Sequence, residues 1–213
     1  MSSDEYSHIP INQNSPYVAE LVEFLQPYAH LKHVSARQRL NLDSGGVQLC
    51  YLILQGRITF QRFHDDLTIA TVSAPSLVGL YGLTSNKVPG YLITQTPCQV
   101  GVISLRKANE VIEENNLWQT LSKHMMVVSG KLYTSSNQLT APTAFDIVRI
   151  QLQELMKEAP EVRSNITAEK YIRNKTHLSR SGVLRILANL KTGGYIETHE
   201  GVLISINHIP EKY

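Results

Sequence analysis

Long apolar runs, cysteines and catalytic signatures are all scarce in this chain of 213 residues. The longest apolar run, residues 49–54, is far shorter than the ~20 residues that a membrane helix requires. The first residues carry Asp4 and Glu5 instead of a basic signal region. No HExxH, GxSxG, GxGxxG or P-loop pattern occurs, so no motif supports enzyme chemistry. We therefore expect a soluble, cytoplasmic protein that is not an enzyme and has no catalytic residues.

The two cysteines, Cys50 and Cys98, are too few for a disulfide framework or a four-thiolate cluster, and neither lies in a CxxC pair. Two interpretations remain open for them: buried small apolar side chains, or a redox-responsive thiol. The chain has eight histidines, and those between residues 30 and 124 are scattered: His30, His33, His64 and His124. This spacing indicates no metal or haem site, and we predict no metal and no cofactor.

Turn signals at roughly ten-residue spacing divide residues 33–105 into short segments rich in β-branched and aromatic residues. Such a pattern is typical of an all-β sandwich or barrel, and a double-sheet jelly roll is the natural candidate. Before it, Ser15 and Pro16 have the order of a helix N-cap and a first helical residue, and apolar residues follow at helical spacing. A first helix is therefore predicted over residues 16–26.

An apolar stripe at steps of four, four, three and four residues follows Ser104, where the chain turns helical again. Its members are Leu117, Leu121, Met125, Val128 and Leu132. The stripe could pack in the chain's own core or pair with a second copy as a dimer helix, and both interpretations remain open. Residues 135–142 are polar and end in proline, which indicates a hinge. Thr143 then caps a helix to about residue 158, with Asp146 placed to reach back to its start.

The last part of the chain has the order helix, tight turn, helix and two short strands, which is that of a winged helix-turn-helix. Thr167 caps a short helix to about residue 175, and Ser179 caps a second helix to about residue 190, before Gly193 and Gly194. Strands over 195–198 and 202–206, with a turn between them, form the wing. We thus expect an α+β chain with a jelly-roll domain (1–110), a dimerisation helix (111–137) and a winged helix-turn-helix domain (138–213).

Positive charge is concentrated in this region, because residues 163–191 contain seven Lys or Arg and one acid, for a local charge of +6. A helical wheel places one side of the second helix opposite Ser181, Arg185 and Ala188, with Arg180 on the flank. The residues on that packed side are Val183, Ile186, Leu187 and Leu190. Arg180 and Arg185 are predicted to contact base edges, since arginine forms a bidentate pair with guanine. Other contacts to duplex DNA, chiefly to phosphates, are expected from Ser179, Ser181, Thr176, Lys175 and His177.

Residues 179–187, which read SRSGVLRIL, resemble the recognition helix of the CRP/FNR family of bacterial transcription regulators. Residues 52–58 are similar to that family's sensor strand and glycine turn, and residues 78–83 to its cyclic-nucleotide phosphate cassette. The resemblance covers nearly the whole chain in the right order. It implies a homodimer, a cyclic-nucleotide-binding-like domain, binding to a two-fold operator, and RNA polymerase as a further candidate partner.

Two departures from the family pattern affect what is expected of the chain. Leu80 stands where the cassette requires a glutamate, and no arginine lies between Arg62 and Arg106 to pair with a cyclic phosphate; the matching loop is residues 87–91. An unpaired bound phosphate would cost several kcal/mol, so we predict that cyclic AMP does not bind. Ser181 replaces the family's glutamate after Ser-Arg, so the family's operator is not carried over.

The sequence therefore predicts a homodimeric DNA-binding transcription regulator that is not controlled by cyclic AMP. One alternative is an oxidant-responsive regulator that senses through Cys50 or Cys98. Another is a ligand-binding or protein-interaction module whose winged helix contacts protein instead of DNA.

Overall fold

The computed structural model describes residues 13–80 and 90–210, and the chain divides into two compact units, Met1–Lys131 and Leu132–Tyr213. The boundary lies inside one long helix. Each unit has its own apolar core.

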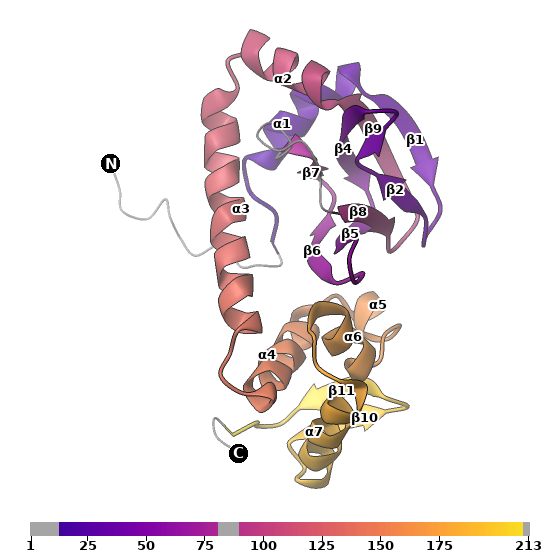
Figure 1. Ribbon diagram of the computed structural model, residues 1–213, viewed down its shortest axis with the longest axis vertical. Helices are drawn as coiled ribbons and strands as arrows, with labels where there is room; N and C mark the ends of the chain where they lie inside the picture. The colour runs from indigo at the N-terminus through magenta and orange to yellow at the C-terminus, as the bar shows by residue number, and fades with distance from the viewer. Residues whose placement is uncertain (1–12, 81–89, 211–213) are drawn as a thin grey trace, which may run out of the picture. The chain divides into compact units, whose positions relative to one another are not determined.

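The N-terminal unit begins with α1 (Val18–Leu25) and the 3-10 turn η1 (Gln26–Tyr28), followed by two antiparallel sheets (Figure 1). The first sheet has the order β1 (His30–Val34), β9 (Cys98–Ser104), β4 (Val47–Gln55) and β3 (Asp43–Ser44), and β7 (Ser76–Val78) also pairs with β4. The second has the order β2 (Arg39–Asn41), β8 (Gly90–Thr94), β5 (Arg57–Arg62) and β6 (Thr68–Ser73). This arrangement confirms the predicted jelly roll.

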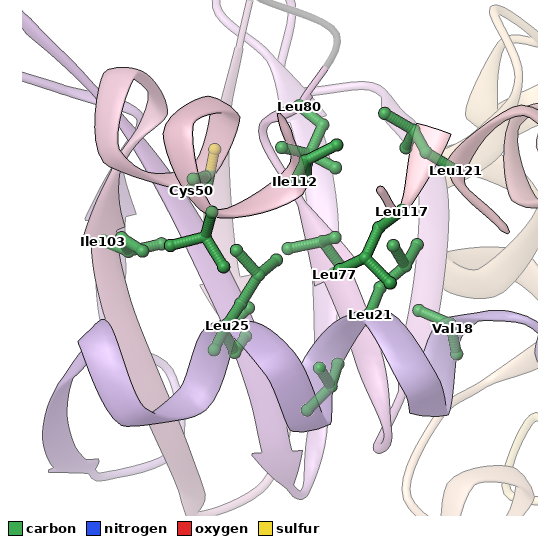
Figure 2. Packing of buried hydrophobic residues seen from close by; sticks show 14 of the residues in the cluster. Val18, Leu21, Leu25, Cys50, Leu77, Leu80, Ile103, Ile112, Leu117 and Leu121 are labelled. Atoms are coloured by element: carbon green, nitrogen blue, oxygen red, sulfur yellow. The ribbon is translucent and has the colours of Figure 1, made fainter. Parts of the chain in front are cut away.

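Two apolar clusters fill the N-terminal unit. One lies among the strands and includes Leu42, Ile53, Ile58 and Leu92, all almost completely buried. The other lies among α1, α2 (Leu105–Glu114) and the strands they cover, and Figure 2 shows its members around Leu25, Ile112 and Leu117. Ser104 is the N-cap of α2, and its hydroxyl accepts a hydrogen bond from the Lys107 backbone N at 3.1 Å.

The first helix starts later than predicted. α1 begins at Val18, because the Ser15 hydroxyl accepts from the Tyr17 backbone N at 3.3 Å and the Ser15 carbonyl accepts from the Val18 backbone N at 3.2 Å, which forms a turn before the helix. The predicted hinge over 135–142 is also mostly helix, since α3 (Trp118–Leu139) continues through the serines. Serine and asparagine cost only about 0.5 kcal/mol each in a helix, and proline is the residue that stops it.

The C-terminal unit contains α4 (Ala144–Lys157), α5 (Pro160–Arg163), α6 (Ala168–Lys175) and α7 (Arg180–Thr192), followed by the hairpin β10 (Ile196–His199) and β11 (Val202–Ile206) (Figure 1). Together with the jelly roll, this order confirms the predicted α+β fold class with a C-terminal winged helix-turn-helix. Within the described residues, no helix has the length and apolar character that a membrane crossing requires.

Candidate DNA-binding surface

Local hydrogen bonds define the two helices of the helix-turn-helix. The Thr167 hydroxyl accepts from the Lys170 backbone N at 3.3 Å, and the Ser179 hydroxyl accepts from the Gly182 backbone N at 3.1 Å. Each bond pairs one of the backbone N–H groups that a helix start leaves unpaired. At the other end, Gly194 has φ +71°, a left-handed conformation that favours glycine and terminates α7. The caps expected from the sequence are therefore present.

One face of α7 is fixed by the core of the C-terminal unit. Val183 and Leu190 are completely buried, together with Leu152 of α4 and Ile172 of α6. Burying such a side chain is worth about 1.5–3 kcal/mol, so this packing sets the rotation of α7 about its axis. The opposite face is left exposed.

The wing is fastened to the helix-turn-helix. β10 and β11 pair around a turn in which Glu200 and Gly201 both have positive φ. The Gly201 carbonyl accepts a hydrogen bond from the Ala168 backbone N at 2.8 Å, at the start of α6. A Cβ at Gly201 would lie 3.2 Å from the Thr167 side chain, so the wing tip sits directly on α6.

The exposed face of α7 carries Ser181, Leu184, Arg185 and Ala188. Arg185 has no acidic partner among the described residues. It lines a groove of about 330 Å³ with Ile186 and Asn189 of α7 and with residues 143–145 at the start of α4. The guanidinium is thus available to a ligand at the helix surface.

Arg180 lies on the flank of α7 and is partly engaged. Its Nε is 3.6 Å from Oε1 of Glu169 on α6, and Arg173 donates to the same oxygen at 3.0 Å. The side chain of Arg180 is nevertheless 70% exposed, so it too can reach a ligand.

Two of the predicted DNA contacts are occupied within the unit. Thr176 is buried, and its hydroxyl donates to the Ile172 carbonyl at 2.9 Å. The Lys175 ammonium donates to the Tyr171 hydroxyl at 2.5 Å and lies 4.0 Å from the centroid of that ring. His177, Ser179 and Ser181 are exposed. Of the predicted set, Arg180, Arg185, Ser179, Ser181 and His177 are therefore the accessible ones.

Leu184 was missed by the sequence reasoning. It is 46% exposed on the face that also carries Ser181 and Arg185. A leucine at this place in a groove-reading helix offers an apolar contact, and the C5 methyl group of thymine is the apolar feature of the major groove. The helical wheel contained the signal, since Leu184 lies outside the buried arc.

Leu80 of the cassette-like segment belongs to the core of the N-terminal unit. It is 6% exposed and lies in the cluster with Leu77, Ile112 and Leu117, as Figure 2 shows. The described side chains that cluster with Leu80 are all apolar. Cassette residues 81–83 and loop residues 87–89 lie outside the described residues.

Both cysteines are buried. Burial raises the pKa of the Cys50 thiol to about 12, so only about one molecule in 10⁵ carries the reactive thiolate at pH 7. The Cys98 thiol contacts the Thr96 carbonyl at 3.2 Å. In the β4–β9 register Cys50 faces Ile103, five residues from Cys98, or ~17 Å along the strand. A disulfide needs Cα atoms within about 7 Å, so the two thiols cannot join in this fold.

The predicted dimer stripe is divided between core and surface. Leu117 and Leu121 are buried in the N-terminal unit, and Met125 packs against the same cluster. Val128 is half-buried and Leu132 is exposed. The most exposed large apolar side chains of α3 are instead Met126 (68%) and Tyr133 (71%).

Within residues 13–80 and 90–210, no three His, Cys, Asp or Glu side chains gather in a way that could hold a metal ion.

Comparisons with known proteins agree with this architecture. Residues 144–211 match the family model described as winged helix-turn-helix DNA binding. The chain is 32% identical to the "Inhibitor of hydrogen peroxide resistance" of Escherichia coli strain K12 over 164 residues, which is 76% of this chain and 79% of that protein.

Solved structures share the fold at low sequence identity. The c-di-GMP-responsive global regulator CLP of Xanthomonas campestris matches with a TM-score of 0.73 and 18% identity, covering 89% of this chain and 99% of CLP. A protein assigned to the CRP/FNR family from Eubacterium rectale matches with a TM-score of 0.64 and 12% identity, covering 88% of this chain and 90% of that one.

Proposed function

Because the chain belongs to the family of the Escherichia coli "Inhibitor of hydrogen peroxide resistance" and shares the fold of CRP/FNR regulators, we propose that it regulates transcription by binding a two-fold DNA operator as a homodimer. The observation that carries the proposal is α7, a capped helix whose free face presents Arg185 and Leu184 with Arg180 beside them. Arginine and an apolar side chain are the residue types that read guanine and thymine in the major groove.

Selection of bound sequences from random duplexes by the purified protein tests this proposal. We expect an inverted repeat with half-sites one helical turn apart, ~10 base pairs. The double variant Arg180→Ala, Arg185→Ala should lose at least a hundredfold in affinity for that operator. The matched control is Lys157→Ala, which removes a cation paired with Glu154 on α4. If the double variant binds as tightly as wild type at physiological salt, the assignment of α7 is wrong.

The exposed face of α3 supports pairing with a second copy. Ser122, Met126, Ser129 and Tyr133 recur at steps of four, three and four residues and are all exposed. This is the spacing of a two-stranded coiled-coil seam, and the serines permit close approach of two helices. We propose this face for the dimer contact, turned away from Leu117 and Leu121, which the core already uses.

Sedimentation of variants on α3 tests the dimer. Met126→Glu together with Tyr133→Glu should give a monomer, because four carboxylates would be buried in the seam without partners. Gln138→Glu, on the other side of the same helix, is the control and should remain dimeric. A dimeric double variant would rule out this face.

The name of the Escherichia coli relative links that protein to hydrogen peroxide resistance. We propose that the target genes of this chain likewise affect survival in peroxide. Removing the gene from its host should raise survival, and the wild-type chain should reverse the effect while the Arg180→Ala, Arg185→Ala variant should not. If the variant reverses the effect as well as the wild-type chain does, the peroxide phenotype does not depend on DNA binding by α7.

We propose that cyclic AMP does not control this chain. Leu80 stands at the glutamate position and is buried among apolar side chains, which supports a sensor-like unit without cyclic-nucleotide chemistry.

A further inference from the structure

Glu169 is an acidic residue in the most basic part of the chain, beside an arginine proposed to read DNA. It lies in the first turn of α6, and its side chain is only 16% exposed. Its Oε1 accepts from Arg173 Nη1 at 3.0 Å and lies 3.6 Å from Arg180 Nε. Residues 163–191 contain no other acid.

The geometry of the contact leaves the reading edge of Arg180 available. The carboxylate approaches the Nε atom, and the two terminal Nη groups have no partner among the described residues. At 3.6 Å this contact is an ion pair longer than a hydrogen bond, so it draws the planar guanidinium toward α6 without fixing its plane. The terminal groups can then form the bidentate pair with guanine O6 and N7.

The charge of Glu169 also affects which DNA is bound. Arg180 is the first residue of α7, where the partial positive charge of the helix start disfavours a cation and favours an anion. A carboxylate at this place reduces the net attraction for phosphates, which supplies essentially all non-specific affinity. The base edge is not penalised in the same way, because guanine O6 and N7 are uncharged hydrogen-bond acceptors.

We propose that Glu169 is a positioning residue that holds Arg180 for base contact and lowers affinity for random DNA, and so raises discrimination in favour of the operator. This inference rests on the proposed DNA-binding function. The other role open to Glu169 is structural, as the partner of Arg173 four residues along α6.

Fluorescence anisotropy with the full-length protein tests the proposal on two duplexes, the selected operator and a random sequence. For Glu169→Gln we expect affinity for the random duplex to rise about threefold to tenfold, with no gain for the operator. With operator affinity unchanged, the ratio of the two dissociation constants should fall by the same factor, about threefold to tenfold. The salt dependence on random DNA should steepen by about one phosphate contact, a slope change of ~0.9.

Two control variants separate positioning from a structural role. Glu154→Gln removes a carboxylate of nearly the same exposure, 15%, whose ion-pair partner is Lys157, and it should leave the ratio unchanged. Arg173→Ala breaks the pair within α6 but keeps Glu169 beside Arg180, so it too should leave the ratio unchanged. If Arg173→Ala lowers the ratio as much as Glu169→Gln does, the role is structural and the proposal fails.

A double-mutant cycle that combines Glu169→Gln with Arg180→Ala tests the positioning role directly. The base pair whose preference is lost in Arg180→Ala is identified first. Glu169→Gln should weaken discrimination at that pair in the wild-type background and have no further effect in the Arg180→Ala background. An equal loss in both backgrounds, or a ratio within twofold of wild type for Glu169→Gln, would overturn the proposal. A wild-type protein that prefers no sequence would instead refute the proposed function.

Discussion

Replacing Leu184 by alanine should weaken operator binding by an amount that its exposure sets. Full burial of a leucine side chain is worth about 1.5–3 kcal/mol, and 46% of Leu184 is still exposed in the free protein. Covering that remainder against a thymine methyl group is therefore worth roughly 0.7–1.4 kcal/mol per half-site. This corresponds to about a threefold to tenfold change in affinity for each half-site.

The assay replaces each thymine of the operator in turn by deoxyuridine, which removes only the C5 methyl group. One symmetric pair of positions should weaken wild-type binding, and the same replacement should leave Leu184→Ala unaffected. Leu31→Ala on β1 is the matched control, because Leu31 is a leucine of the same exposed fraction, 46%, in the N-terminal unit. Its operator affinity should equal that of wild type.

Either of two results would refute a contact between Leu184 and a thymine methyl group. If no thymine is sensitive to loss of its methyl group, or if Leu184→Ala binds the operator within twofold of wild type, Leu184 does not face the bases. Because about half of the side chain is already covered in the free protein, its removal should lower the free energy of unfolding by roughly 0.8–1.6 kcal/mol. A loss of that size leaves a domain folded, and a denaturant titration of the variant separates a loss of binding from a loss of fold.

Three further predictions concern the N-terminal unit. Leu80→Glu should lower the free energy of unfolding by several kcal/mol, because it buries a carboxylate among apolar side chains, and calorimetry should detect no cyclic AMP binding; a stable variant that binds the nucleotide would contradict the core assignment. Burial, reinforced by the charge of Lys131, lowers the pKa of His124, so the unfolded chain binds a proton that the folded chain excludes. Stability should therefore fall as the pH drops below about 6.5, and His124→Gln should flatten that decline in denaturant titrations; an unchanged pH profile would refute it. Cys50 and Cys98 should resist alkylation until denaturant is added, and rapid labelling of the native protein would revive the thiol-sensor hypothesis.

Local signals in the sequence were sufficient to predict where the helices of the helix-turn-helix begin and end. Ser179, Thr167 and Gly194 act through bonds within a few residues of themselves, so their positions predict the ends of α6 and α7. The jelly roll was likewise predictable from the spacing of its turns. The helix through residues 135–139 was not, because weak intrinsic preferences do not decide whether a long helix continues.

Several side-chain contacts, local as well as tertiary, could not be predicted from the sequence. Thr176 and Lys175 looked free as residue types, but the Ile172 carbonyl and the Tyr171 ring occupy them. The apolar residues along α3 do recur at helical spacing. Which side of α3 faces the core depends on its packing against α1, which lies far earlier in the chain. Periodicity alone could therefore not say that Leu121 faces inward while Met126 faces solvent.

The bond between the Gly201 carbonyl and the Ala168 N–H has a consequence for the DNA itself. It joins the wing to the helix pair, so the reading surface forms before any partner arrives and little ordering entropy remains to be lost on binding. Because the protein surface is already formed, the DNA duplex has to bend to fit it. We expect the flexibility of the base pairs between the half-sites, which no side chain touches, to influence affinity through the energy of bending them.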